Sequence, residues 1–294
     1  MGSKLSFLPF FFVLFFLFSQ SKAKIDINTI ERLKGCHKGS KVQGLHNLKL
    51  YLARFGYLNY QHTPNHVNAE NDEFDQKLEA ALKSYQNFYH LNASGTLDGP
   101  TVSQMIMPRC GQPDKKISHK HGKSLLNIVS HYQFFPNSLR WPPSKSHLTY
   151  AFGLNYPNAY VPPVVRAFNT WASASGYFTF SRVDDVTSAD LKITFENPTH
   201  GDRDFDENVL AHAFSPTDGR FHYNANMNWS SGPGPVSGAF DLETVAVHEI
   251  GHLLGLRHSE DRNAIMWSSI PIGAVKGLNA DDIQGIKALY ELNN

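Results

Sequence analysis

The sequence predicts an α+β protein in which a small three-helix domain precedes a larger domain of strands and three helices. Apolar residues recur at helical spacing through most of the first hundred residues. Beyond residue 146, short apolar runs typical of strands alternate with helical segments. Residues 112–146 between these regions are rich in Pro, Lys, His and Ser, a composition typical of a linker and a domain boundary.

Length, composition and charge exclude several classes of protein. The chain has 294 residues, 41% of them hydrophobic and 18% charged, which predicts one or two folded domains rather than disorder. Lys and Arg number 27 against 26 Asp and Glu, so the formal net charge is +1 and we expect no nucleic-acid partner. With 15 histidines and two cysteines, any bound metal is expected to have mainly imidazole ligands.

The N-terminus predicts export from the cell. Residues 1–23 read as a signal peptide, because a lysine precedes an apolar run over 5–18 and small residues follow at the cleavage position. The alternative, a membrane anchor, needs a run of ~20 residues and a stop-transfer flank. Sequons at Asn92 and Asn228 agree with export. We therefore expect a secreted, extracellular protein without a membrane anchor, and a monomer.

The first domain, residues 24–118, is predicted to contain three helices. Helical periodicity covers 42–55 and 74–89, and a third helix begins where either Asp98 or Thr101 can cap it. The segment 119–131 is expected to be an exposed linker that a protease can cut.

The second domain, residues 132–294, alternates strand and helix signals. Strands are expected at 148–152, 177–181, 191–195, 209–214 and 221–224, and helices at 164–174, 242–254 and 280–290.

The strongest chemical signal is an HExxH string on the helix predicted at 242–254. His248 and His252 stand at i and i+4, so both imidazoles can reach one Zn²⁺. Glu249 lies beside them, free to act as a general base. Gly255 suits a left-handed helix end, after which the chain can return His258 as a third ligand. Three protein ligands leave a coordination position open, which is typical of catalytic zinc.

The string from His248 to His258 is the metzincin signature. The resemblance implies a metzincin zinc-protease domain with a mixed twisted sheet and three helices, acting on protein or peptide substrates. It also implies that Met266 belongs to a Met-turn that packs beneath the zinc ligands. The segment 210–214 resembles the edge strand along which this group aligns an extended substrate.

A second motif, PRCGQPD, ends the helical domain. A thiolate from Cys110 can be a fourth zinc ligand, and Arg109 and Asp114 can pair to hold it in place. The motif matches the cysteine switch of matrix metalloproteinase (matrixin) zymogens, and the chain is most similar to plant matrixins, which lack a haemopexin-like domain. The alternative is a disulfide between Cys110 and Cys36, which would leave no thiol.

The matrixin resemblance also implies how the precursor is activated. An activating protease would cut the linker, and the mature chain would begin near Tyr132. The new ammonium would then pair with Asp281 or Asp282 on the last helix.

A third group of residues predicts a structural zinc site. His200, Asp202, His212 and His222 supply three imidazoles and one carboxylate, a full tetrahedral shell without an open position. Spacing alone leaves a solvated histidine-rich loop as the alternative. The resemblance favours the zinc site, because HGD, LAHAF and FH stand in the family's order.

Calcium is a point where the sequence departs from the family. Matrixins bind Ca²⁺ through carboxylates after the last structural-zinc histidine, where this chain has Asn224 and Met227. Asp206 is followed by a shortened loop. Methionine offers no oxygen ligand, so we expect this Ca²⁺ site to be weak or absent.

Together these features predict a secreted zinc endopeptidase made as a latent zymogen. One alternative is a catalytically weak or inactive extracellular matrix- or wall-binding protein with a retained metal site; the intact Glu249 disfavours it. Another is a zinc enzyme acting on a non-peptide amide, which the predicted substrate-binding edge strand disfavours.

Overall fold

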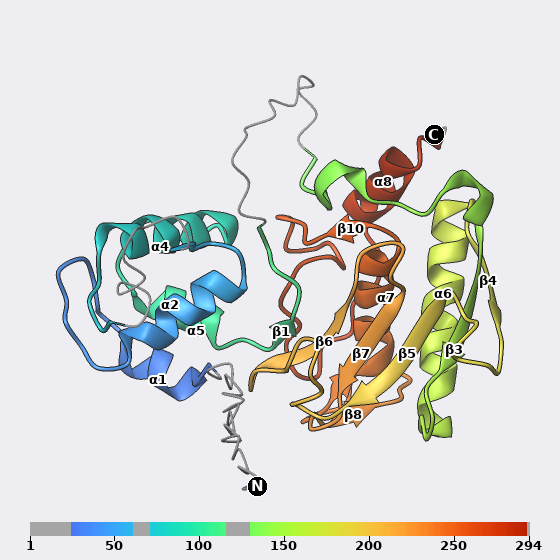
Figure 1. Cartoon of the computed structure of the whole chain (residues 1–294), viewed down its shortest axis with the longest axis horizontal. Helices are drawn as coiled ribbons and strands as arrows, with labels where there is room; N and C mark the ends of the chain where they lie inside the picture. The colour runs from blue at the N-terminus through green and yellow to red at the C-terminus, as the bar shows by residue number, and fades with distance from the viewer. Residues whose placement is uncertain (1–24, 61–70, 116–129, 293–294) are drawn as a thin grey trace, which may run out of the picture.

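A computed structural model of the chain describes residues 25–60, 71–115 and 130–292. The predicted signal peptide and most of the predicted linker lie outside these residues. Within the described ranges, no helix is both long enough and apolar enough to cross a membrane. Figure 1 shows two domains side by side, with the strand β1 running between them.

The N-terminal domain is helical, as predicted. It contains α1 (Ile27–Arg32), α2 (Leu45–Arg54), α4 (Gln76–Phe88) and α5 (Gly99–Met105). The sequence analysis missed α1, which has six residues and is too short to show a periodic apolar face. Of the two candidate caps for α5, Asp98 is the one used, and its carboxylate accepts the backbone N–H of Thr101 at 3.0 Å.

The C-terminal domain is built on a mixed sheet. Its strands are β3 (His147–Phe152), β4 (Thr179–Arg182), β5 (Leu191–Glu196), β6 (Val209–Ala213) and β7 (Arg220–Asn224). The order is β6-β7-β5-β3-β4, with β6 antiparallel to β7 and the other pairs parallel. All five predicted strands are therefore present, within two residues of the predicted ends.

Three helices accompany this sheet, as predicted: α6 (Val161–Ser175), α7 (Leu242–Leu253) and α8 (Ala280–Leu289). The helix α6 begins three residues before the predicted start, because Pro162 and Pro163 fit its first turn, where no intrahelical N–H bond is needed. Both α6 and α7 contribute apolar side chains to one core with the sheet. Short elements complete the fold: β2 (Gln133–Phe134) pairs with β10 (Leu256–Arg257), β8 (Trp229–Ser230) pairs with β9 (Phe240–Asp241), and single 3₁₀ turns occupy Pro136–Ser138, Pro143–Lys145 and Asn158–Tyr160.

The two domains are joined through the sheet itself. Strand β1 (Arg109–Cys110) of the N-terminal domain pairs in parallel with β6 and becomes the outermost strand. On its other side, the N–H of Cys110 donates to the carbonyl of Ser268 at 2.9 Å. The domains also share apolar packing, since Phe205, Val209 and Trp267 of the second domain belong to the hydrophobic core of the first.

Candidate active site

The helix α7 places the first two histidines of the HExxH string. Asp241 caps its N-terminus by accepting the N–H of Thr244 at 2.8 Å, and residues 244–253 are all buried. The helix ends as predicted, because Gly255 takes φ +107°, where a Cβ would collide with the Leu139 carbonyl. The chain then turns back through β10 and brings His258 to the same point.

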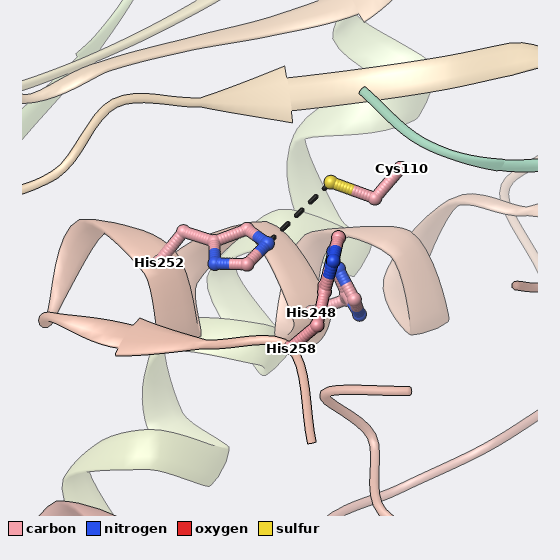
Figure 2. Close-up of side chains that lie close together, drawn as sticks. All are labelled: Cys110, His248, His252 and His258. Carbon is pink, nitrogen blue, oxygen red and sulfur yellow. Dashed lines mark hydrogen bonds between the residues drawn. The ribbon is translucent and has the colours of Figure 1, made fainter. Parts of the chain in front are cut away.

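Four predicted ligands converge at this point. The ligand atoms of Cys110, His248, His252 and His258 lie within 4.8 Å of one another, and all four residues are buried. Figure 2 shows the sulfur of Cys110 directed at the histidines, 3.4 Å from Nε2 of His252. The first domain thus contributes one member of a four-residue cluster that otherwise belongs to the second domain.

The histidines are oriented by bonds on their far nitrogens. Nδ1 of His248 lies 2.7 Å from the carbonyl of Ile265, and Nδ1 of His252 lies 2.8 Å from that of Leu256. Nδ1 of His258 lies 2.7 Å from a carboxylate oxygen of Asp114. Each Nε2 is therefore the nitrogen that faces the cluster, and within the described ranges those of His248 and His258 are buried without a hydrogen-bond partner. This donor set, with the far nitrogens anchored, fits Zn²⁺.

Glu249 is fully buried beside the cluster. Both of its carboxylate oxygens lack a hydrogen-bond partner among the described residues, and burial raises the pKa of Glu249 to about 8. The Cys110 thiol and the backbone of Ala213 act in the other direction and favour its ionised form. A buried carboxylate beside a metal cluster can exchange a proton with a reacting group.

Met266 packs against the helix that carries the first two predicted ligands. Its sulfur packs so closely on Gly251 of α7 that a Cβ at Gly251 would collide with it. The side chain fills space beneath the helix, and Met266 is not a member of the ligand cluster.

Cys110 is a free cysteine, and so is Cys36. The disulfide alternative is therefore wrong for this structure. Burial and the neighbouring Glu249 raise the pKa of the Cys110 thiol well above its usual value. A bound Zn²⁺ acts in the opposite direction, because a thiol that coordinates the metal is deprotonated.

The predicted Arg109–Asp114 pair holds the cysteine segment. The guanidinium lies 2.7 Å from the carboxylate, and both side chains are almost inaccessible to solvent. The Arg109 guanidinium also packs 3.5 Å above the centre of the Phe55 ring. Although burial opposes ionisation, the charge of Arg109 and the hydrogen bond from His258 hold the pKa of Asp114 well below its usual value.

The third predicted group also gathers in space. His212 and His222 are directly opposite each other on β6 and β7, and the loop after β5 brings His200 and Asp202 beside them. The ligand atoms of His200, Asp202 and His212 lie within 4.8 Å of one another. His222 falls outside that group of three, but its Nε2 lies 3.3 Å from Asp202. Burial lowers the pKa of His212 and of His222, which favours the neutral imidazole that binds metal.

The expected calcium region makes contacts with the N-terminal domain instead. Asp206 lies 2.7 Å from the guanidinium of Arg54 and accepts the N–H of Ile25 at 3.1 Å. The side chain of Asn208 donates to the carbonyls of Met105 and Met107 at the end of α5. These two residues in the loop therefore bind the first domain.

Comparison with known proteins identifies the family. A family model described as matrixin matches residues 140–291, slightly more than half of the chain. The chain is a matrixin. A second model, described as a putative peptidoglycan binding domain, matches residues 41–105 of the helical domain.

Relatives of this matrixin include plant and animal enzymes. It is 41% identical to Metalloendoproteinase 1 of Glycine max over 267 residues, covering 87% of this chain and 85% of the relative. Identity to Metalloendoproteinase 5-MMP of Arabidopsis thaliana is 40%, over 89% of this chain and 75% of the relative. Human Matrix metalloproteinase-20 is 35% identical over 71% of this chain and 41% of its own length. The matrixin is thus a zinc-dependent endopeptidase that hydrolyses peptide bonds in proteins.

Sequence reasoning missed two contacts at the site of this matrixin. Asp114 contacts His258 as well as Arg109, and the motif indicated only the second partner. Tyr89 bonds Asp114 within its own domain and Ser268 across the domain boundary, although its helical spacing indicated only a core position. No sequence signal separates these roles from ordinary packing.

Proposed function

We propose that this matrixin is exported as a latent precursor, with Cys110 as the inhibitory fourth ligand of a catalytic zinc held by His248, His252 and His258. Residues 1–23 would be the signal peptide, 24–118 the prodomain, 119–131 the linker and 132–294 the catalytic domain. The observation that carries the proposal is the position of the Cys110 sulfur within the histidine cluster. A thiolate there occupies the coordination position that catalysis needs.

Bound zinc supplies Lewis-acid activation of the scissile carbonyl and of a water molecule. In the proposed mechanism, Glu249 accepts the proton of the attacking water and delivers it to the leaving amine. The bonds on the far nitrogens of His248 and His252 hold their orientation through the reaction, whereas the Asp114 partner of His258 leaves with the prodomain. Strand β6 can align an extended substrate by strand addition once β1 has left it.

We place a second, structural zinc at His200, Asp202, His212 and His222. Support comes from the opposed positions of His212 and His222 and from the burial of three imidazoles around one carboxylate. All four donors come from the protein, so this site has no position for substrate.

Activation is proposed to follow a cut in the linker, with the mature chain starting near Tyr132. The backbone N–H of Tyr132 already lies 3.1 Å from Asp281, whereas Asp282 accepts the N–H groups of Ile265 and Met266. Asp281 is therefore the candidate partner for a new ammonium at Tyr132. We further propose an extracellular, monomeric enzyme that needs an activating protease, with Asn92 and Asn228 exposed for glycosylation.

The precursor itself tests the latency proposal. Cys110→Ser is expected to hydrolyse a fluorogenic peptide without linker cleavage, because a hydroxyl is a far weaker zinc ligand than a thiolate. Cys36→Ser is the matched control and should remain latent, since Cys36 lies in the prodomain core. A latent Cys110→Ser precursor with normal zinc content would contradict the proposal.

The alternative of an inactive wall- or matrix-binding protein is not favoured. Glu249 stands beside the histidine cluster with both carboxylate oxygens unpaired, an arrangement that a binding protein does not need.

A further inference from the structure

A cavity of about 240 Å³ lies beside the cysteine segment, between the two domains. The prodomain side is formed by Gln112, Pro113 and Lys115. Two arginines, Arg203 and Arg257, lie on the catalytic-domain side. All three prodomain residues precede the proposed cleavage site, so activation removes them and opens the cavity to the substrate cleft.

The remaining wall is mostly apolar, with Ser215 as its polar residue. Phe135, Pro136 and Leu139 line the cavity from the segment that follows β2. This wall stays after activation and limits solvent on one side of the two guanidinium groups, so charge interactions there are screened less than on an open surface.

The two arginines have little compensating charge in this position. Nη1 of Arg203 is buried and has no hydrogen-bond partner among the residues that the structure describes. Arg257 donates to the carbonyl of Pro113 at 3.3 Å and interacts with the charge of Asp114. Both of these partners leave with the prodomain.

The carboxylates near the cavity do not replace those partners. Asp202 pairs with Arg220 and belongs to the proposed structural zinc site. Glu249 is assigned to proton transfer. The activated cleft consequently contains two cations and an apolar wall without a dedicated anion among the described residues.

The position of the cavity along the cleft follows from β6. The N–H of Gly111 donates to Ala211, and the side chain of Gln112 donates to the Ala213 carbonyl, so the cavity lies toward the C-terminal end of β6. Antiparallel pairing is the more stable mode for an added strand. A substrate antiparallel to β6 places the residues before its scissile bond at this end. Cys110 marks the position of the scissile bond, and Gln112 lies two residues beyond it along the cleft. The cavity beside Gln112 is therefore expected to contact the second or third substrate residue before the scissile bond.

We propose that Arg203 and Arg257 form a subsite for an acidic side chain, Asp or Glu, two or three residues before the scissile bond. The inference rests on the proposed function and adds a substrate class to it. A carboxylate bound there replaces the prodomain carbonyl as the partner of Arg257 or pairs with the unbonded Nη1 of Arg203.

Paired peptides test the subsite on the activated enzyme. Cleavage sites found in a proteome-derived peptide library define a parent peptide, which is then made with Glu or Gln at each of the two positions. The wild-type enzyme is expected to prefer Glu over Gln in kcat/KM by about tenfold or more at one position, as for one charge-assisted hydrogen bond. The preference should fall as salt increases.

Variants assign the preference to these residues. Arg203→Gln and Arg257→Gln should each reduce the Glu/Gln ratio, Arg203→Lys should restore part of it, and Arg203→Glu should favour a Lys peptide. Arg182→Gln is the matched control, because Arg182 lies on β4 at the opposite edge of the sheet. Its Glu/Gln ratio should equal that of the wild type.

The outcomes separate the inference from the proposed function. Equal cleavage of Glu and Gln peptides by an active wild-type enzyme, or an unchanged ratio in the Arg203→Gln/Arg257→Gln double variant, would overturn the subsite alone. Failure of the activated, zinc-loaded enzyme to cut any library peptide would overturn the proposed function and the subsite with it.

Discussion

Replacing Arg109 with methionine should release the cysteine from the active site of the intact precursor. In the wild type, the guanidinium bonds both carboxylate oxygens of Asp114, at 2.7 and 3.2 Å, and the hydroxyl of Tyr89 at 3.1 Å. Methionine preserves much of the side-chain volume but no charge. The Asp114 carboxylate then stays buried, with hydrogen bonds only from Tyr57, Tyr89 and His258.

Removing one partner of a buried ion pair costs about 3–5 kcal/mol. We use the lower end, ~3 kcal/mol, because Asp114 keeps three hydrogen bonds. Each ~1.4 kcal/mol changes an equilibrium constant tenfold, so the open form of the precursor should become about 100-fold more populated. Adding Asp114→Asn removes the uncompensated charge, so the double variant should open less than the single variant.

The exposure of the Cys110 thiol measures this opening. Precursors carrying Glu249→Gln cannot cut their own linker, and the rate of maleimide labelling at Cys110, separated from Cys36 by mass spectrometry, reports the open population. Arg32→Met is the control, since the Arg32 side chain is 68% exposed. The reasoning would be refuted if Arg109→Met raised the labelling rate of Cys110 by less than about tenfold. It would also be refuted if the double variant were labelled faster than the single variant.

Three further predictions concern the proposed sites. Glu249→Gln should lower peptide hydrolysis by the mature enzyme more than about 100-fold with unchanged zinc content; retained activity would contradict its role as the base. Metal analysis should find two zinc ions per mature chain, and His222→Ala should lose one and lower the Tm by roughly 5 °C or more. One zinc in the wild type, with His222→Ala as stable, would exclude the structural site. N-terminal sequencing of the active form should find a start near Tyr132, and Asp281→Asn should lower its activity without loss of zinc. An active form that still contains Cys110 would refute the activation scheme.

The sequence predicted those parts of the fold that depend on contacts near in sequence. Helices α2, α4 and α7 have periodic apolar faces or strong caps, and each was found within a few residues of its actual limits. The two-residue strands β1 and β10 were not predicted. They are defined by partners a hundred or more residues away, and two residues carry no alternating pattern.

The distinction between contacts near in sequence and contacts between distant segments also applies to the site. The spacing of His248 and His252 fixes their geometry on one helix, so the metal cluster was predictable. The contact between Asp114 and His258 depends on how two domains dock, and their separation of 144 residues carries no spacing rule. The proposed role of Arg203 could not be predicted either, because the other residues that line its cavity come from four separate segments of the chain.

We expect the hydrophobic core that the two domains share to make the proposed activation irreversible. Phe205, Val209 and Trp267 complete the core of the prodomain, and each large apolar side chain contributes ~1.5–3 kcal/mol when buried. A domain of this size has a total stability of about 5–15 kcal/mol, so the severed prodomain loses a large part of it on departure. We expect the free prodomain to unfold and be degraded rather than to rebind. Once the linker is cut, the cell can stop the enzyme only with a separate inhibitor or by destroying it.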